Sequence, residues 1–186
     1  ITKNKFSKEL FFLIYPQLKN IDLFKRLNNF SKNTLLKKNF DFFIALLVID
    51  ETDNANYFLH KYKVSNQTKK KIIFLKKLYD NKICKKFFSK KNLEKIFYYE
   101  GKDNLIDLID FYLIRSNKNS KKLIELKQNF VSKEIPMFPL KTKDIMEKYN
   151  LKEGRELGRK LKNLEIIWVE NSFKISQSEI DEILLS

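Results

Sequence analysis

The scarcity of turn-forming residues is the feature that most restricts the fold of this chain. Only three Gly and three Pro occur in 186 residues, whereas Leu, Ile, Lys and Glu are abundant. Sandwiches and barrels need many tight turns, which depend on Gly and Pro. We therefore predict an all-α fold, with a multi-helix, bundle-like body and a small helical tail sub-domain.

Apolar spacing and capping residues divide the body into a series of helices. The predicted segments cover residues 8–14, 20–29, 39–49 and 53–63, a helix of about fourteen residues from Ser65-Asn66, one that Ser89 caps and that ends near Gly101, and residues 102–115 and 120–131. The segment 39–49 is apolar on nearly all sides, which predicts a central buried helix. Asp53 is expected to cap the helix that follows it.

Pro136 and Pro139 must interrupt helical structure, so we place a sub-domain boundary beside them. Residues 1–134 form the predicted body and residues 135–186 the predicted tail. In the tail, Thr142 is expected to cap a helix over 143–149, and a longer helix is expected from 154 to 169. Ser176 and Glu179 match a capping box that begins a short last helix.

The charge balance favours a polyanionic partner. Lys and Arg number 38 against 23 acidic residues, a net charge of +15. Such an excess commonly serves phosphates, because basic side chains release counterions when they meet them. A second interpretation stays open: only four of these residues are Arg, and Lys, Asn, Phe and Ile are the residues of A/T-rich codons. A biased genome would then raise Lys without selection for binding.

Two helices carry the basic residues that we expect to contact phosphate. On the helix that begins at Ser65-Asn66, Ile72, Leu75, Leu78 and Tyr79 share one side, and Lys69, Lys70, Lys76 and Lys77 share another with Ile73. Twelve Lys and one acid, Asp80, lie between Lys61 and Lys91.

On the 154–169 helix, Leu157, Leu161, Leu164 and Trp168 form a narrow apolar stripe. Arg155, Arg159 and Lys162 fall roughly opposite it, free for phosphate oxygens. Gly154 and Gly158 lower helix stability, so we expect another backbone to pack closely against them. That backbone could be protein or RNA, and the position of the glycines beside the core side favours protein.

No catalytic centre or metal site is predicted within the chain. No Gly-rich phosphate loop can be written from Gly101, Gly154 and Gly158, and Asp107 and Asp110 are interpreted as the solvated flank of a buried stripe. The single Cys84 has no identifiable base beside it, and one histidine, His60, cannot build a Cys/His metal site.

No targeting or membrane segment is visible in the sequence. There is no signal peptide and no apolar run of about 18 residues, so we expect a cytoplasmic protein with no membrane partner. The first residue is Ile1 rather than Met, and we expect the chain to be a piece of a longer protein.

Three segments together resemble the bacterial CCA-adding tRNA nucleotidyltransferases, a branch of the poly(A) polymerase family. Residues 138–146 (FPLKTKDIM), 153–161 (EGRELGRKL) and 164–169 (LEIIWV) follow the tail pattern of the alphaproteobacterial members. Val64-Ser65-Asn66 is similar to a helix start in the body of these enzymes, and Tyr15–Lys19 to the end of the neck. The chain departs from the pattern at Thr142, Tyr149-Asn150 and Arg155, where relatives have Gly, Leu-Gly and Pro.

The resemblance implies that the chain is the tRNA-binding part of an enzyme that adds CCA to the tRNA 3′ end. It implies a catalytic head, with Mg²⁺, CTP and ATP, and a neck that are not in this chain, which itself holds no cofactor. The implied partners are the acceptor/T arm of tRNA and the enzyme's own N-terminal head and neck. The residues expected to touch RNA are Lys69, Lys70, Lys76, Lys77, Lys143, Arg155, Arg159 and Lys162.

Two alternatives remain open from the sequence. One is a freestanding basic helical module that binds RNA or DNA. The other is a structural helical scaffold whose Lys content is a genomic habit, which predicts basic residues spread evenly over the surface. The choice between CCA and A-only addition depends on domains outside this chain.

Overall fold

The computed structural model describes residues 5–80, 87–117 and 120–185. Within those ranges the chain forms eleven α-helices and one 3₁₀-helix (η1), with no strand. The elements in order are α1 (Lys5–Ile14), η1 (Lys19–Lys25), α2 (Asn29–Leu35), α3 (Phe40–Val48), α4 (Asn54–Lys61), α5 (Asn66–Asp80), α6 (Lys90–Glu100), α7 (Lys102–Ser116), α8 (Lys121–Val131), α9 (Thr142–Tyr149), α10 (Arg155–Glu170) and α11 (Gln177–Leu185). The all-α prediction is confirmed. Cys84 lies outside the described residues.

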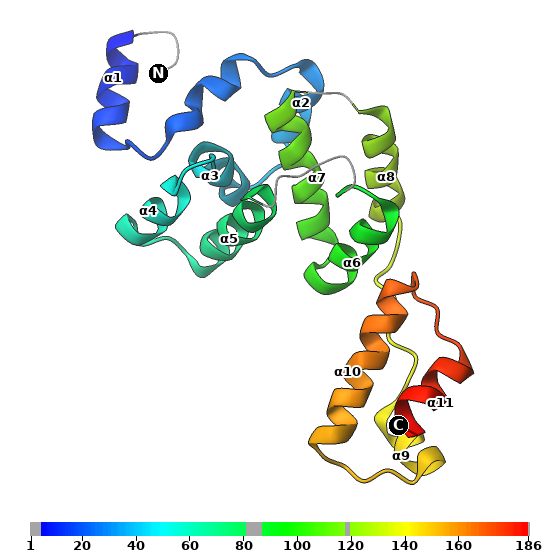
Figure 1. Ribbon diagram of the computed structural model, residues 1–186. Helices are drawn as coiled ribbons and strands as arrows, with labels where there is room; N and C mark the ends of the chain where they lie inside the picture. The colour runs from blue at the N-terminus through cyan, green and yellow to red at the C-terminus, as the bar shows by residue number, and fades with distance from the viewer. Residues whose placement is uncertain (1–4, 81–86, 118–119, 186) are drawn as a thin grey trace.

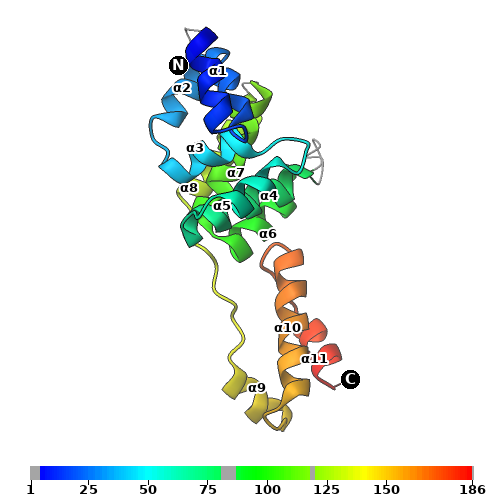
Figure 2. The ribbon, with the colours of Figure 1, turned by 90° about the vertical axis from the view of Figure 1, so that its left-hand side faces the viewer.

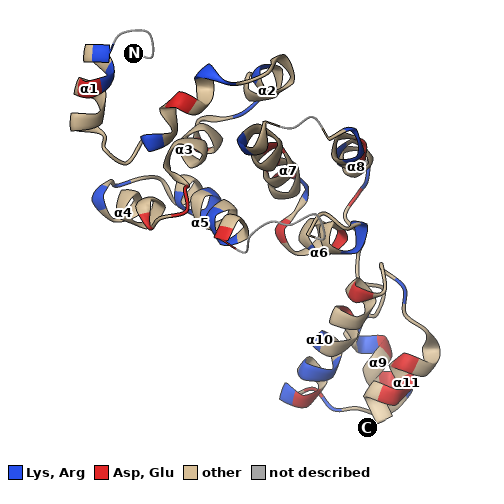
Figure 3. Cartoon of the chain, turned by 45° about the horizontal axis from the view of Figure 1, so that its top comes forward, with Lys and Arg blue, Asp and Glu red and all other residues tan. Residues whose placement is uncertain are grey.

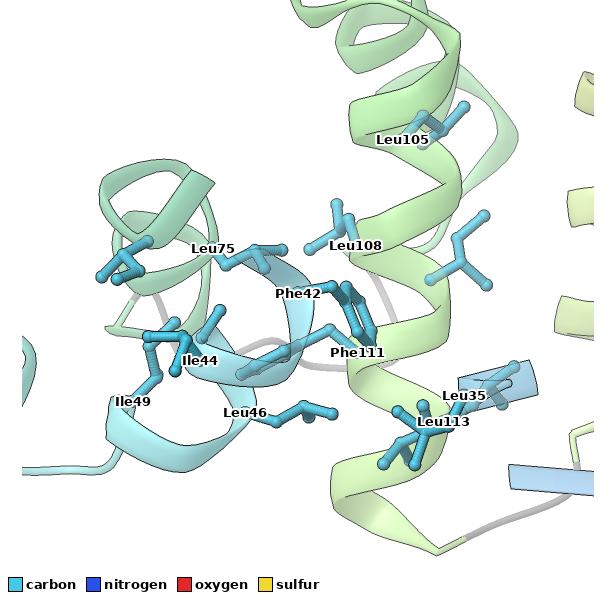
Figure 4. Packing of buried hydrophobic residues seen from close by; sticks show 14 of the residues in the cluster. Leu35, Phe42, Ile44, Leu46, Ile49, Leu75, Leu105, Leu108, Phe111 and Leu113 are labelled. Carbon is cyan, nitrogen blue, oxygen red and sulfur yellow. The ribbon is translucent and has the colours of Figure 1, made fainter. Parts of the chain in front are cut away.

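The apolar helix α3 lies at the centre of the body, as its sequence predicted. It contacts η1, α4, α5 and α7 (Figure 1). Phe42, Leu46 and Ile49 are fully buried, and Figure 4 shows Phe42 pointing toward Phe111 of α7. Their rings meet edge to face with centroids 6.4 Å apart, a favourable geometry for aromatic pairs. Leu75 of α5 completes this side of the core.

The N-terminal part of the body differs from the sequence prediction. The predicted helix over 20–29 is wrong: η1 ends at Lys25, and a separate helix, α2, begins at Asn29. The physical reason is a cap, because the side chain of Asn28 accepts a hydrogen bond from the backbone N–H of Ser31 at 2.8 Å. Asn39 starts α3 in the same way, through the N–H of Phe42.

Two of the four predicted caps formed as expected. Ser89 accepts from the N–H of Asn92, and the reciprocal bonds of Ser176 and Glu179 form a capping box. The cap at Thr142 is wrong, since α9 begins at that residue. Asp53 precedes α4 but bonds to the Asn56 side chain instead of the helix backbone.

A second hydrophobic cluster belongs to the tail helices α9, α10 and α11. Its buried members are Ile145, Leu157, Leu164, Ile180 and Leu184. Residues 132–141, with both prolines, run as an extended segment from α8 to α9, which Figures 1 and 2 show from two sides. The N- and C-terminal ends of the described chain lie at opposite ends of the molecule.

The tail meets the body through the C-terminal half of α10. Trp168 is almost fully buried, and its ring lies within 5.0–5.5 Å of those of Tyr98, Phe138 and Phe173. Around these rings, Tyr98 donates a hydrogen bond to Glu165, and Lys95 pairs with Glu170 at 2.6 Å. The prediction that Trp168 belongs to an apolar stripe of α10 is confirmed.

The expectation that another protein backbone packs closely against Gly154 and Gly158 is wrong for the described residues. A Cβ added at either position would meet nothing within 4 Å. Both glycines are exposed at the N-terminal end of α10, and packing of an RNA backbone there stays a prediction.

Candidate nucleic-acid interface

The lysines of this chain fall into two groups, and the first group is neutralised inside the fold. Lys38 lies 2.7 Å from Asp107 and 2.6 Å from Asp110. Lys71 pairs with Asp107, and Lys127 with Asp110, both at 2.6 Å. The interpretation of the two aspartates as a solvated flank is therefore wrong: their carboxylates pair with lysines of the α2–α3 loop, α5 and α8, and Asp110 is 1% exposed.

Lys38 is the centre of this ionic cluster. Burial alone would lower its pKa, but the charge of Asp110 and hydrogen bonds to Asp107 and Asp110 outweigh burial, so the pKa of Lys38 is raised above its ordinary value. Lys38 is therefore charged at neutral pH and serves to compensate buried carboxylates. It is not available as a free cation for a ligand.

The predicted basic sector of α5 divides between the two groups. Lys69, Lys70 and Lys77 are exposed and enter no ion pair among the described residues, and Ile73 shares their exposed side. Lys76 is different: its side chain is 12% exposed, and its ammonium lies 2.5 Å from Asp80 and 3.3 Å from the backbone oxygen of Asp50. The expectation that Lys76 belongs with the free cations is wrong, because the α3–α4 loop covers it.

The basic residues of α10 lie in its N-terminal half. Arg155, Arg159 and Lys162 are exposed and have no carboxylate partner within the described ranges. The acidic residues Glu165 and Glu170 lie in the other half, beside α6, whereas Glu156 lies in the first turn among the basic residues. Figure 3 shows most of the blue of α10 at this N-terminal end, with some red beside it. In Figure 1 the basic end projects on the side of the molecule that carries α5, away from α8.

Lys143 stands at the start of α9, also exposed and without an ion pair in the part of the chain described. Lys160 of α10 differs from Lys143, because its ammonium donates a hydrogen bond to the backbone oxygen of Leu184 and its side chain is 13% exposed. Seven of the eight residues expected to contact RNA are therefore exposed cations, and they occupy α5 and the tail.

A polar cleft of about 700 Å³ lies beside the exposed lysines of α5. It is lined by the loop before α3 and by the first turns of α5 and α7: Lys37, Lys38, Asn39, Asn66, Gln67, Lys70, Lys71, Asp103, Asn104, Ile106 and Asp107. Of the predicted residues, only Lys70 lines it. Lys37, which is exposed, was missed by the sequence analysis. The Lys37-Lys38-Asn39 run before an apolar helix was the available signal for it.

Two other kinds of site are absent from the part of the chain that the structure describes. No three His, Cys, Asp or Glu side chains gather there in a way that could hold one metal ion. No helix there has the length and apolar character needed to cross a bilayer.

Comparison with known proteins found no match to this chain among family models, curated proteins or solved structures. The resemblance to the CCA-adding enzymes therefore stays a prediction from the sequence.

Proposed function

We propose that this chain binds structured RNA by its phosphates, as the tRNA-holding body and tail of a CCA-adding nucleotidyltransferase. Two lines of argument support the proposal. The motifs at residues 138–169 resemble the tail of those enzymes, and the cations expected to touch RNA are, apart from Lys76, exposed and without ion pairs among the described residues.

The observation that carries the proposal is the sorting of basic residues. Lys38, Lys71 and Lys127 form ion pairs with the buried Asp110 and the largely buried Asp107. Lys69, Lys70, Arg155 and Arg159 are exposed to solvent. The charge of an exposed cation without a carboxylate partner is not neutralised inside the protein, so it can attract a phosphate group. Binding of that phosphate releases counterions.

Sequence-independent clamping is the mechanism that this arrangement supports. Duplex RNA hides its base edges in a deep, narrow groove, so a helical basic surface reads its shape and phosphates. The α5 group would hold one stretch of the backbone and the basic end of α10 another. Two separated points of contact define the direction of an RNA arm better than one would.

The test is RNA binding measured over a salt titration, with a trimmed tRNA as the probe. Arg155→Glu with Arg159→Glu should weaken binding and reduce the slope of log affinity against log salt by about 0.7–0.9 for each phosphate that the protein no longer neutralises. The matched control is Lys121→Glu with Lys122→Glu on α8, which makes the same charge change on exposed residues outside the proposed interface.

The control also separates the proposal from its alternatives. A scaffold whose basic residues are spread evenly over the surface predicts that both double variants lose the same amount of RNA affinity. Equal losses would count against a defined interface. Equal affinity of the unaltered chain for duplex DNA and for tRNA would favour the freestanding nucleic-acid-binding module.

The enzymatic part of the proposal concerns a longer protein. We expect the reading frame upstream to encode a catalytic head, and the full-length protein to incorporate CTP and ATP onto a trimmed tRNA. Because the proposed centre lies in the head, the chain alone should bind that tRNA without extending it. Extension by the chain alone, or a full-length protein without extension activity, would contradict this assignment.

A further inference from the structure

The polar cleft beside α5 has a composition that suits an anion. We propose that this cleft binds a single backbone phosphate of the RNA, an inference that rests on the function proposed above. Four lysines and two aspartates line it, and the residues expected from the sequence include only one of them, Lys70. The cleft thus adds a defined pocket to an interface otherwise made of side chains on open surface.

The four lysines of the cleft differ in exposure and in ion pairing. Lys38 and Lys71 are about 10% exposed and both pair with Asp107, at 2.7 and 2.6 Å. Lys37 and Lys70 are exposed and enter no ion pair within the described residues. Lys38 and Lys71 therefore neutralise the largely buried carboxylate of Asp107, and Lys37 and Lys70 supply the charge for a ligand.

Three helices begin at this cleft. Asn39 precedes α3, Asn66 and Gln67 open α5, and Asp103 and Asn104 belong to the first turn of α7. Backbone N–H groups at a helix start carry partial positive charge and attract anions. The side chains of Asn39 and Ser65 cap α3 and α5, but Gly101 precedes α7 and offers no side chain, so the first N–H groups of α7 have no side-chain cap.

Size and net charge restrict the ligand. Pockets of about 300–1,000 Å³ are typical of small-molecule sites, and this cleft falls in that range. Asp103 is exposed on one wall and has no ion pair among the described residues, so it opposes a dense negative charge. One phosphodiester group, with its adjoining sugar among the amides of Asn39, Asn66 and Gln67, fits this balance better than a triphosphate does.

The first experiment is a titration of the chain with inorganic phosphate and then with CMP, followed by NMR shifts of backbone amides. Residues 37–39, 66–71 and 102–104 should shift together. Lys37→Gln with Lys70→Gln should weaken phosphate and CMP binding at least about fivefold. Lys121→Gln with Lys122→Gln removes two exposed lysines that do not line the cleft and should leave both affinities unchanged. Neither pair is in the buried ionic cluster, so both variants should fold.

The second experiment measures tRNA affinity for the same variants. Lys37→Gln with Lys70→Gln should lower it by about fivefold and reduce the salt slope by about one phosphate contact, and added CMP should compete with the RNA at this site. If the unaltered chain binds tRNA and this variant binds it equally well, the cleft inference is wrong and the proposed function stands. If the unaltered chain binds no tRNA, both are overturned, and phosphate shifts that persist would then mark the cleft as a site for a free phosphate compound.

Discussion

The ammonium group of Lys38 lies 2.6 Å from the carboxylate of Asp110, in a part of the body where Asp110 is almost completely removed from water. A buried carboxylate is tolerated only when it is paired and hydrogen-bonded. Lys38 and Lys127 both pair with Asp110, so the α2–α3 loop, α7 and α8 are joined through one side chain.

Asp110→Asn should destabilise the body strongly. The substitution keeps the shape but leaves two lysine charges facing a neutral amide, and breaking a buried ion pair in this way costs about 3–5 kcal/mol. The free energy of unfolding, measured by urea denaturation, should fall by that amount. Asp103→Asn on the same helix is the control, because Asp103 is exposed and should change the value little. A small decrease at Asp110 would mean that the cluster is not closed to solvent.

Gly158→Ala should stabilise the tail by about 0.5–1 kcal/mol. The position is inside α10, and the added Cβ would meet nothing within 4 Å. Thermal unfolding followed by circular dichroism measures the gain. Gly101→Ala is the opposite case, since Gly101 has φ +86° between α6 and α7, and a side chain there should cost about 1–3 kcal/mol. Destabilisation by Gly158→Ala would show that this face of α10 is covered.

Tyr98 should be the last tyrosine to ionise among those at the junction of body and tail. Burial, together with the hydrogen bond that it donates to Glu165 and the charge of that carboxylate, raises its pKa from 10.0 to about 12. The neutral form is the one that the folded state favours. Its contribution to stability is therefore complete below pH 10 and is lost as the pH rises through about 12.

Absorbance at alkaline pH measures this titration directly. Tyr98→Phe should remove the late-ionising component of the tyrosinate signal. Glu165→Gln should move that component to lower pH, because the acceptor charge that opposes ionisation is gone. An unchanged titration in Glu165→Gln would contradict the hydrogen bond as the cause.

Trp168→Ala should loosen the tail from the body. The indole packs against Tyr98 of α6, Phe138 of the extended segment 132–141 and Phe173 of the turn after α10. Removal of a buried Trp of this kind lowers the free energy of unfolding by about 3–5 kcal/mol. Amide exchange should accelerate throughout α10 while the amides of α3 stay slow. Ile166→Ala, at a half-exposed position of the same helix, should have a much smaller effect. Equal acceleration in α3 would indicate that body and tail unfold as one unit.

The sequence predicted those features that depend on neighbouring residues. The burial of α3 and the stripe ending at Trp168 follow from local periodicity, and the caps at Ser89 and Ser176 follow from spacing within one turn. The missed start of α2 was also local in origin, because Asn28 is a strong capping residue whose signal the longer apolar pattern concealed.

Features that depend on distant residues could not be predicted. Asp107 appears solvated on a helix projection, and only the approach of Lys38, 69 positions away, makes it a buried ion-pair partner. Lys76 shares a helix face with Lys69, yet the loop at Asp50 covers Lys76 and leaves Lys69 exposed. The cleft exists only because the starts of α3, α5 and α7 meet.

The attachment of α10 at one end has a mechanical consequence. The helix has 16 residues, which corresponds to about 24 Å at 1.5 Å per residue, and only its C-terminal half is anchored on α6. It therefore works as a lever whose pivot is Trp168 and whose tip carries Arg155. The 13 residues between Arg155 and Trp168 span about 20 Å, so a tilt of about 10° at the pivot would move the tip by about 3.5 Å. Under the proposed function, such a tilt would let the N-terminal end of α10 fit RNA arms of slightly different diameter while the residues around Trp168 hardly move.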